Sequence, residues 1–577
     1  MDKKEVAEIL EEIGTFLELK DENPFKVRAY YNASRAIDTL SEDLDTLIKE
    51  KRLRDIQGIG QGLAEKITEL VTTGKSKYYE TLKKSVPLGL LEMLTVPAIG
   101  PKKAKKLHEE LGVKSIGELE YACKENRLLD LEGFGEKSQS KILQGIQFIK
   151  KHQEYHLYPE ALEAAEAILE ALKQDKKIRR ISIAGSLRRK KEVIRDVDLV
   201  VSAKDPERVL QRFTSLRGIE TVQQKGETKA SILLKSGIQA DLRVISEKEF
   251  PYALHHFTGS KEHNIAMRSR AQRMGYKMNE YGLFKGNRLI SCKDEEEIFK
   301  KFGLSYIPPE LREDTGEIQA AEAGKLPVLL QPKDLQGIFH VHTTYSDGTA
   351  TLEQNAKEAF RLGFKYLGIS DHSPAAHYAH GVDVERLKKQ HKEIDMLKEK
   401  YKGKLAILKG TEADILPDGS LDYPEKVLKT FDFVVASIHS RFSMNEKEMT
   451  QRILKAMANP YVTMLGHPTG RLLLSREPYA VDLRELIDAA KKYNVIIELN
   501  ANPQRLDLDW RMCKLAKQKG VLISINPDAH HLETLTDIYF GVGIAQKGWL
   551  SPSDVLNTFP LSKILPRLRK RTAQHKQ

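Results

Sequence analysis

The sequence predicts a multidomain protein of the α and α/β classes, with a helical N-terminal region, a mixed middle and a C-terminal seven-stranded (β/α) barrel. At 577 residues the chain is too long for one hydrophobic core, so several domains are expected. Residues 1 to about 150 have helical periodicity, whereas beyond residue 335 apolar strand-like runs alternate with helical segments. That alternation is typical of a parallel sheet or barrel.

The composition of the chain indicates what kind of molecule it binds. A net charge of +11 and a pI near 9.1 favour a polyanion such as nucleic acid. Three cysteines fit neither a disulfide framework nor a Cys-x-x-Cys metal site, which indicates a reduced, cytoplasmic protein. The N-terminus lacks an apolar signal core, and no apolar run reaches the roughly 20 residues of a membrane helix. We therefore expect no membrane contact and, without an oligomer signal, a monomer.

A glycine-centred turn recurs in the helical region, each time before a helix-like run. The three copies contain Gly58-Ile59-Gly60, Ala98-Ile99-Gly100 and Gly133-Phe134-Gly135, the middle one with alanine in the first position. Such a turn points backbone N–H groups at an anion and can hold a DNA phosphate without reading sequence. One copy would serve equally well as a helix connection, but three on a basic chain favour DNA. The segments resemble helix-hairpin-helix motifs.

An acidic site is predicted in the middle of the chain. Gly185 and Ser186 interrupt a strand-like run where backbone N–H groups and a hydroxyl could bind phosphate. Asp196 and Asp198 lie two residues apart on the next run, so both carboxylates face one side of a strand, and Asp241 lies on a third run. Three such carboxylates could hold two Mg²⁺ or Mn²⁺ ions roughly 4 Å apart for in-line attack on phosphorus. An isolated Asp-x-Asp would more often be a solvated turn.

The order of the motifs identifies a family. Residues 1 to about 309 resemble a family X DNA polymerase, the family of DNA polymerase beta. The resemblance depends on a series of residues that appear in the family's order: Gly185, Ser186, Arg189, Asp196, Asp198, Asp241, Phe257, Gly259, Ser260, Asn264 and Arg268.

The resemblance assigns expected roles to these residues. Asp196 and Asp198 would bind both metals, and Asp241 would bind the catalytic metal and help to activate the primer 3′-OH. Ser186 and Arg189 would hold the nucleotide's β- and γ-phosphates, which Gly185 allows to approach closely. In the Phe257-Thr258-Gly259-Ser260 run, Phe257 and Gly259 would pack on the sugar of the deoxynucleoside triphosphate. Asn264 would contact the base and Arg268 the template.

Some positions depart from the family's pattern. His256 replaces a tyrosine, which puts discrimination against ribonucleotides in question, and Gln239 replaces an arginine. Lys66 matches the family's Schiff-base lysine, and Lys26 and Tyr30 match its pocket for a 5′-phosphate, but Gly62 replaces a lysine there. The resemblance implies recognition of a 5′-phosphate at a gap, with 5′-deoxyribose-phosphate lyase activity as an open alternative to an ordinary surface lysine. The predicted DNA-binding residues are Lys26, Tyr30, Gly58, Gly60, Lys66, Gly100, Gly133 and Gly135.

The sequence of the C-terminal third predicts a metal centre. Of its seven apolar runs, six end in or lead to histidine or carboxylate side chains. Because the C-terminal ends of parallel strands converge on one face of a barrel, these side chains should meet there. With no cysteine among them, Mn²⁺, Zn²⁺ or Fe would suit the site. The nine candidate ligands are His340, His342, Asp347, His372, Glu412, His439, His467, Asp528 and His530.

This region, about residues 335 to 560, resembles the PHP (polymerase and histidinol phosphatase) domain, a distorted seven-stranded barrel with a trinuclear metal cluster. All nine positions of the family's pattern are filled. Joined to a polymerase, the domain implies 3′→5′ exonuclease activity, with abasic-site endonuclease and 3′-phosphatase activity as extensions. Glu498 and Asn500 would support the ligands, and Arg441 and Arg471 are candidates for contacts to phosphate.

The expected function is gap filling in base-excision repair on gapped or primer-template DNA, combined with trimming of 3′ ends. Two alternatives are a small-molecule phosphatase and a DNA-end-binding scaffold, each with a vestigial polymerase site, but the intact aspartates and ligands argue against both. The predicted domains are a lyase-like helical domain (1–85), a fingers-like helix-hairpin-helix region (86–155), a nucleotidyltransferase palm (156–245), a thumb-like subdomain (246–310), a linker (311–335) and the PHP domain (336–577).

Overall fold

The chain forms two compact units in the computed structural model, residues 1–153 and residues 154–577. The structure describes residues 1, 3–38, 40, 42–124, 127–129, 131–152, 155–474 and 476–574. All three cysteines are buried and have free thiols. The division confirms a multidomain protein, and each unit is described by itself.

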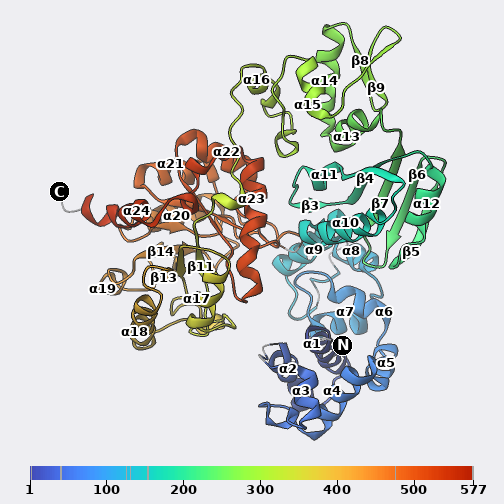
Figure 1. The fold of residues 1–577 in the computed structure, drawn as a ribbon. Helices are drawn as coiled ribbons and strands as arrows, with labels where there is room; N and C mark the ends of the chain where they lie inside the picture. Colours follow the sequence, from blue (N-terminus) through green and yellow to red (C-terminus); the bar gives the residue numbers. More distant parts are fainter. Residues whose placement is uncertain are drawn as a thin grey trace. The chain divides into compact units, whose positions relative to one another are not determined.

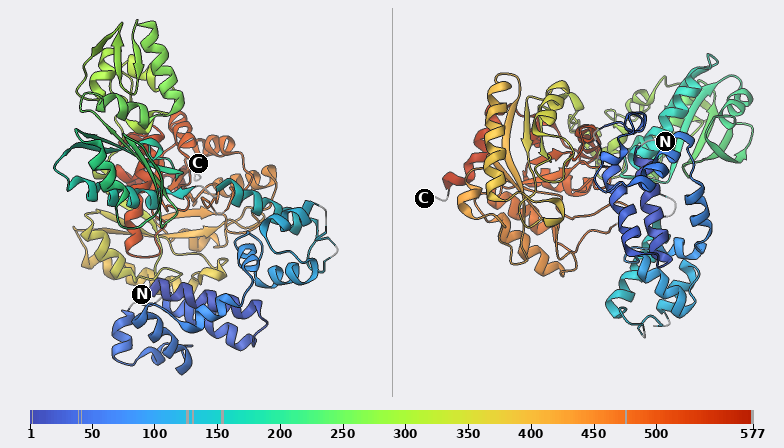
Figure 2. Two further views of the ribbon diagram at one scale, coloured as in Figure 1. Left: turned by 90° about the vertical axis from the view of Figure 1, so that its right-hand side faces the viewer. Right: turned by 90° about the horizontal axis from the view of Figure 1, so that it is seen from below.

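Residues 1–153 are helical in every described segment with regular structure, as the blue to cyan ribbons of Figures 1 and 2 show. The first helix has apolar side chains at Leu10, Ile13 and Leu17, a spacing that places them on one face, where all three are fully buried. The elements are α1 (Lys3–Leu19), α2 (Pro24–Asp38), α3 (Leu44–Lys49), η1 (Leu53–Asp55), α4 (Gln61–Thr73), α5 (Lys77–Lys84), α6 (Leu88–Leu94), α7 (Pro101–Leu111), α8 (Ile116–Lys124) and α9 (Glu136–His152).

The three repeated turns share one backbone conformation. Their first residues all have a left-handed φ, +91° at Gly58, +76° at Ala98 and +86° at Gly133. The apolar residue in the centre of each turn is buried, while the residues on either side of it are exposed. The alanine of the middle copy therefore keeps the glycine conformation, at a cost of about 1–2 kcal/mol for a residue with a Cβ.

The second unit begins with a five-stranded sheet in the order β2-β4-β7-β6-β5. On β4, Val197, Leu199 and Val201 face one side of the sheet, where they pack with residues of α10 and α12, whereas Val200 packs with residues of α13 on the other side. Asp196 and Asp198 lie on the α13 side by the same alternation. The elements are β1 (His156–Leu157), α10 (Tyr158–Lys173), β2 (Ile178–Ile183), α11 (Gly185–Arg188), β3 (Val193–Ile194), β4 (Asp196–Ala203), α12 (Pro206–Thr214), β5 (Ile219–Lys225), β6 (Lys229–Leu234) and β7 (Gln239–Ile245).

A smaller subdomain follows, and the predicted linker contributes to its core. Arg312 and Glu317 are fully buried, Arg312 against Glu295 and Glu317 against His263. Two charged residues of the segment 311–335, which was predicted to be a linker, are thus paired inside the protein. The elements are α13 (Phe250–Thr258), α14 (Lys261–Arg273), β8 (Lys277–Asn279), β9 (Gly282–Lys285), β10 (Arg288–Ile290), α15 (Glu295–Lys301), η2 (Pro309–Leu311), α16 (Glu317–Glu322) and η3 (Pro332–Asp334).

The C-terminal region is a seven-stranded parallel sheet in sequence order, β11 to β17, as predicted. A bridge between Val341 and Ala529 joins its first strand to the segment after its last, so the barrel is nearly closed. The strands are β11 (Gly337–Val341), β12 (Tyr366–Ile369), β13 (Ala406–Asp414), β14 (Phe433–Ser437), β15 (Met464–Leu465), β16 (Ile496–Asn500) and β17 (Ile523–Asn526).

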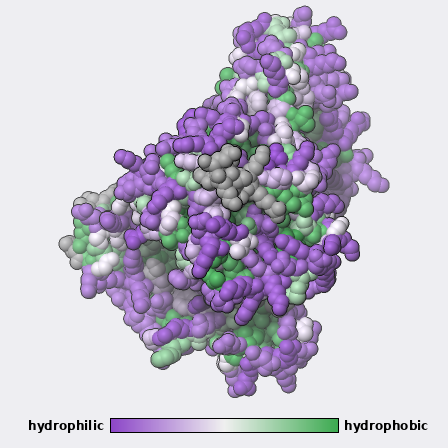
Figure 3. Space-filling view, turned by 90° about the vertical axis from the view of Figure 1, so that its left-hand side faces the viewer, coloured by the Kyte–Doolittle hydropathy of each residue, from purple (hydrophilic) through white to green (hydrophobic). Residues whose placement is uncertain are grey.

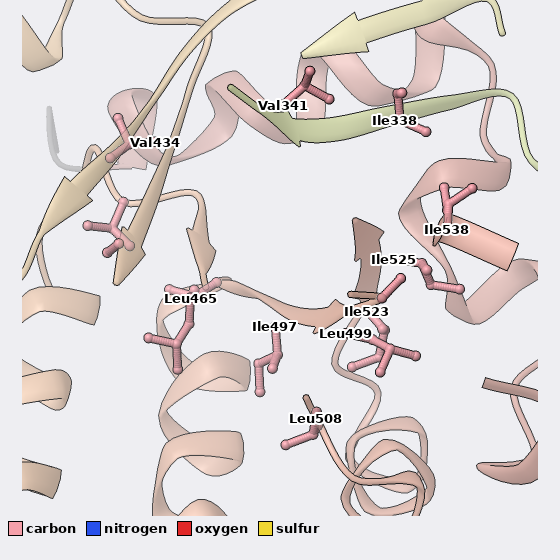
Figure 4. Close-up of a cluster of buried hydrophobic side chains, with 14 of the residues drawn as sticks. Ile338, Val341, Val434, Leu465, Ile497, Leu499, Leu508, Ile523, Ile525 and Ile538 are labelled. Atoms are coloured by element: carbon pink, nitrogen blue, oxygen red, sulfur yellow. The ribbon is translucent and has the colours of Figure 1, made fainter. Parts of the chain in front are cut away.

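Two layers of apolar side chains hold this barrel. Figure 4 shows part of the larger layer, including Ile338, Ile497 and Ile525. A second cluster contains Phe339 and Phe433, and a Cβ at Gly368 would lie within 2.7 Å of both rings. The helices are α17 (Leu352–Arg361), η4 (His377–Ala379), α18 (Val384–Lys400), α19 (Glu425–Leu428), α20 (Glu446–Met457), α21 (Leu483–Tyr493), α22 (Trp510–Lys519), η5 (Glu533–Asp537), α23 (Ile538–Lys547), η6 (Pro552–Asp554), η7 (Leu556–Thr558) and α24 (Leu561–Gln574).

The face drawn in Figure 3 is mainly hydrophilic, with hydrophobic residues scattered over it. In the described parts of the chain, none of the helices combines the length and the apolar character needed to cross a bilayer.

We expect Ala98→Gly to stabilise the middle turn by about 1 kcal/mol, because glycine adopts the left-handed conformation without steric cost. Amide hydrogen exchange of α7 in the full-length protein measures the change. Ala104→Gly, inside the same helix, is the matched control and should destabilise α7 by about 1 kcal/mol or more. Faster exchange in Ala98→Gly would contradict the assignment of strain to this turn.

Candidate active sites

The three predicted polymerase carboxylates come from two adjacent strands. Strands β4 and β7 run parallel, and their register places Asp198 opposite Asp241 and Asp196 opposite Gln239. The hydroxyl group of Ser231 on β6 donates a hydrogen bond to Asp241, and the Gln239 amide nitrogen lies 3.4 Å from the same carboxylate. Gln239 thus contacts Asp241 from the position where the family has an arginine.

Burial and mutual repulsion raise the pKa of this acidic cluster. Burial, with the charges of Asp196 and Asp241, raises the pKa of Asp198 to about 7. Burial and Asp241 also raise the pKa of Asp196. A set of carboxylates that cannot all ionise comfortably is the donor set that divalent cations neutralise.

The turn before β4 lies directly against the acids. Gly185 has φ +61°, and a Cβ there would lie 2.1 Å from a carboxylate oxygen of Asp198. Only glycine fits this position. The turn therefore lies beside the carboxylates, as a nucleotide phosphate held by the turn would require.

A cavity of about 420 Å³ opens at this point. All eight predicted nucleotide-binding residues line it, together with two of the acids. Lys261, at the start of α14, also lines it and was not predicted, because nothing in its sequence context separates it from other surface lysines. The lining residues are Gly185, Ser186, Arg189, Asp196, Asp198, His256, Phe257, Gly259, Ser260, Lys261, Asn264 and Arg268.

The predicted 5′-phosphate residues also lie together, within residues 1–153. The Lys66 ammonium lies 4.3 Å from the ring centroid of Tyr78 and 5.8 Å from that of Tyr30, and Lys26 lies 5.9 Å from Tyr78. Two cations over two aromatic rings suit an anion.

The nine predicted PHP ligands gather at the C-terminal ends of the barrel strands. Glu412, at the end of β13, is central. Its oxygens lie 3.3 Å from His340 Nε2, 3.0 Å from His372 Nδ1, 3.3 Å from His439 Nε2 and 2.9 Å from His467 Nε2. In the described residues, ligand atoms within 4.8 Å of one another form three groups, namely His342, Asp347, His372 and His530; His340, His342 and Glu412; and His372, Glu412 and His439.

Asp528 and His467 lie beside these groups, since Asp528 is 3.2 Å from His342 and His467 contacts Glu412. The backbone is strained at three predicted ligands, with φ +57° at His340, +21° at His467 and +52° at Asp528. For residues with a Cβ, such strain is concentrated at functional sites, where the surrounding structure holds it.

The donor chemistry fits metal ions. His340 Nδ1 lies 2.6 Å from Glu498, and His439 Nδ1 lies 2.5 Å from Asp414, so each ring can hold its proton there and offer Nε2 to a metal. His340 Nε2 is buried and makes no hydrogen bond to the part of the chain that is described, although two carboxylates surround it. Asn500 donates to Asp528, so Glu498 and Asn500 both contact predicted ligands.

The charges around the site are strongly coupled. Burial lowers the pKa of His342 to about 3, helped by its histidine neighbours. Burial would also lower the pKa of His439, but Glu412 and Asp414 raise it to about 10.

The arginines near this site differ from the prediction. Arg471 donates from Nε to the Arg505 carbonyl and from Nη2 to that of Leu506, so its donors support a loop. Arg441 is exposed at φ +59°. Arg505 instead places Nε 3.5 Å from Asp528, with a buried Nη1 that has no hydrogen-bond partner among the described residues. Its sequence context gave no signal, because the loop folds back over the barrel.

Comparisons with known proteins agree with this architecture. A DNA polymerase beta thumb model matches residues 253–313, a PHP domain model residues 339–502, a helix-hairpin-helix domain model residues 1–76 and a SAM-like helix-hairpin-helix tandem model residues 90–147. A DNA polymerase/3′-5′ exonuclease PolX from Bacillus subtilis is 40% identical over 98% of this chain and 99% of its own.

Two other relatives match shorter parts of the chain. A probable phosphatase from Caldanaerobacter subterraneus is 34% identical over 33% of this chain and 74% of its own. A repair DNA polymerase X of African swine fever virus is 34% identical over 23% of this chain and 80% of its own.

The fold, the acidic cavity and these matches define a polymerase beta-like DNA polymerase with helix-hairpin-helix and PHP domains. The similarity to the Bacillus subtilis protein extends over almost the entire chain, and the chain belongs to the PolX family.

We expect Glu412→Gln to lose more than one metal ion per protein, because Glu412 belongs to two of the three ligand groups. Asp347→Asn, in one group only, should lose about one ion. Elemental mass spectrometry of the purified variants gives the metal content, with exposed Glu385→Gln as the control. Equal losses in Glu412→Gln and Asp347→Asn would contradict the sharing of Glu412.

Proposed function

We propose that this protein fills short gaps in DNA during base-excision repair, as a monomer, and trims 3′ ends with its PHP domain. The observation that carries the proposal is the cavity in which the Gly185–Arg189 turn and the Phe257–Ser260 run meet Asp196 and Asp198. The Bacillus subtilis relative, a DNA polymerase and 3′-5′ exonuclease, supports it over nearly the full length. The probable phosphatases cover only a third of the chain, so a small-molecule phosphatase leaves most of the structure without a use.

In the polymerase site, the chain's own residues bind and orient the reactants. Ser186 and Arg189 would hold the β- and γ-phosphates of a deoxynucleoside triphosphate, and Gly185 lets them approach. Phe257 and Gly259 would support the sugar, Asn264 the base and Arg268 the template. Asp196, Asp198 and Asp241 would hold Mg²⁺ or Mn²⁺, which supplies charge neutralisation at the transferred phosphate. Asp241 would help to activate the primer 3′-OH, and phosphoryl transfer then depends mainly on alignment.

In the PHP site, the nine ligands would hold Mn²⁺, Zn²⁺ or Fe, which activate water and polarise a phosphate ester. Glu498 and Asp414 fix the orientation of His340 and His439. We assign Arg505, rather than Arg441 or Arg471, to the scissile phosphate, because its buried Nη1 still has hydrogen-bonding capacity beside Asp528. Abasic-site endonuclease and 3′-phosphatase activity would use the same groups.

DNA is held without sequence readout. The exposed backbone at Gly58–Gly60, at Gly100 and at Gly133–Gly135 opens toward solvent before a helix, where phosphates are favoured. The pocket of Lys26, Tyr30 and Lys66 would receive the 5′-phosphate of a gap. Because Lys66 and Lys26 both lie over the Tyr78 ring and two cations suit an anion, we assign Lys66 to phosphate binding rather than to lyase chemistry.

We expect Asp198→Ala to lose gap filling by at least about 10³-fold while it keeps 3′ trimming, because only the polymerase site loses a carboxylate. His342→Ala should show the reverse. A labelled primer in a one-nucleotide gap, followed with and without nucleotides, measures both activities. Joint loss in either variant would argue against two separate sites, and wild type inactive in both assays would refute the proposal.

We expect Lys66→Ala to reduce the preference for a 5′-phosphorylated gap by roughly tenfold, because a charge-assisted contact to phosphate is lost. Binding to gaps with and without the phosphate measures this preference, with exposed Lys77→Ala as the control. Borohydride trapping of a DNA adduct in wild type but not in Lys66→Ala would instead establish the lyase.

A further inference from the structure

Each residue of the basic run that follows the phosphate turn, Arg188 to Lys191, has an acidic partner. Arg188 pairs with Glu295 at 2.5 Å and Arg189 with Glu313 at 3.0 Å. Lys190 lies 3.7 Å from Glu310, and Lys191 lies 3.6 Å from Glu313. Glu313 therefore faces two cations of the polymerase half, one of which lines the nucleotide cavity.

A third cation reaches Glu313 from the PHP domain. Lys547, at the end of α23, is fully buried, and its ammonium contacts Glu313 and lies 3.2 Å from the Arg189 carbonyl oxygen. The Trp510 ring lies 5.0 Å from the same ammonium. The neighbouring Gln546 accepts a hydrogen bond from Lys190 at 2.9 Å. A buried lysine is costly unless it is paired, so this contact is a specific one.

The charge on Glu313 bears directly on Arg189. Burial would raise the pKa of Glu313, but Lys547, Arg189 and Lys191 hold it below its usual value, so the carboxylate stays ionised. An ionised carboxylate at this position competes with a nucleotide's phosphates for the Arg189 guanidinium. The competition weakens as other cations satisfy Glu313.

The remaining donors of Arg189 are oriented by the protein. Nε donates to Glu313 and Nη1 donates to the Thr258 carbonyl, next to Gly259. The Nη2 atom of Arg189 makes no hydrogen bond to the described residues, and Arg189 lines the nucleotide cavity. Two fixed contacts thus leave one face of the guanidinium for a ligand.

We propose that Lys547 of the PHP domain is a positioning residue of the polymerase site, which satisfies Glu313 so that Arg189 stays aligned and available to the phosphates of the incoming nucleotide. The PHP domain thereby completes the nucleotide site of the other half. This inference rests on the proposed role of Arg189 in nucleotide binding.

The test is steady-state gap filling by the full-length Lys547→Met variant. We expect the KM for the deoxynucleotide to rise about tenfold with kcat changed less than twofold, because Arg189 is drawn toward Glu313 without any loss of metal ligands. Lys547→Arg, which keeps the charge, should restore KM to within about threefold. An unchanged KM in Lys547→Met would overturn the proposal.

A second variant separates electrostatics from folding. In a Glu313→Gln background the competing charge is gone, so adding Lys547→Met should change KM less than twofold. A further tenfold rise there would refute the role of Glu313. The 3′ trimming rate, measured on the same samples, should stay at the wild-type value and reports an intact PHP domain.

Lys514→Met is the matched control. Lys514 also reaches from the PHP domain to the other half, donating to the Thr315 carbonyl at 2.6 Å, but it does not contact Glu313. The KM of Lys514→Met should match that of wild type. A rise equal to that in Lys547→Met would refute a specific role for Lys547. Arg189→Ala tests the underlying assignment, because an unchanged KM there would refute the nucleotide role of Arg189 itself. If the KM rises in Arg189→Ala but not in Lys547→Met, the positioning role of Lys547 is refuted, whereas the nucleotide role of Arg189 is not.

Discussion

Buried carboxylates are the constraint on which the rest of this structure depends. A carboxylate that is buried away from water is stabilised by a nearby positive charge, and only some of the buried carboxylates of this chain have one. Glu295 lies between Arg188 and Arg312, which hold its pKa far below the usual range, and it serves as a structural centre of its subdomain. Asp198 is buried beside Asp196 and Asp241, so its pKa rises. A buried carboxylate paired with arginine, such as Glu295, thus has a structural role, whereas Asp198 lies in an acidic cluster whose excess negative charge a metal ion would neutralise.

Much of this arrangement was predictable because it is periodic or local. Alternation along β4 put Asp196 and Asp198 on one face, and seven apolar runs became seven strands in the same order. The nine ligands lie at strand ends, where parallel topology brings them together. The burial of Arg312 in segment 311–335 could not be predicted, because its partner Glu295 lies in another element. Arg505 and Lys547 likewise depend on contacts that no local pattern reveals.

The relatives differ in how much of this chain they match. The viral relative matches 23% of the chain and the probable phosphatase 33%, whereas the Bacillus subtilis relative matches 98%. Within the chain, Glu313 pairs with Arg189 beside the nucleotide cavity and with Lys547 at the end of α23, so these ion pairs join the polymerase and PHP regions. Two regions joined in this way gain electrostatic coupling from residues that serve neither reaction directly.

The barrel's closure has a consequence for how the protein is made. Its ligands run from His340 to His530, and the first strand pairs through Val341 with Ala529, at the opposite end of the domain's sequence. During synthesis, a ribosome must release nearly the entire chain before the complete ligand set can exist. An ion captured early by a partial set of these predicted ligands would be a kinetic trap for the barrel, so we expect metal loading to follow synthesis of the whole domain.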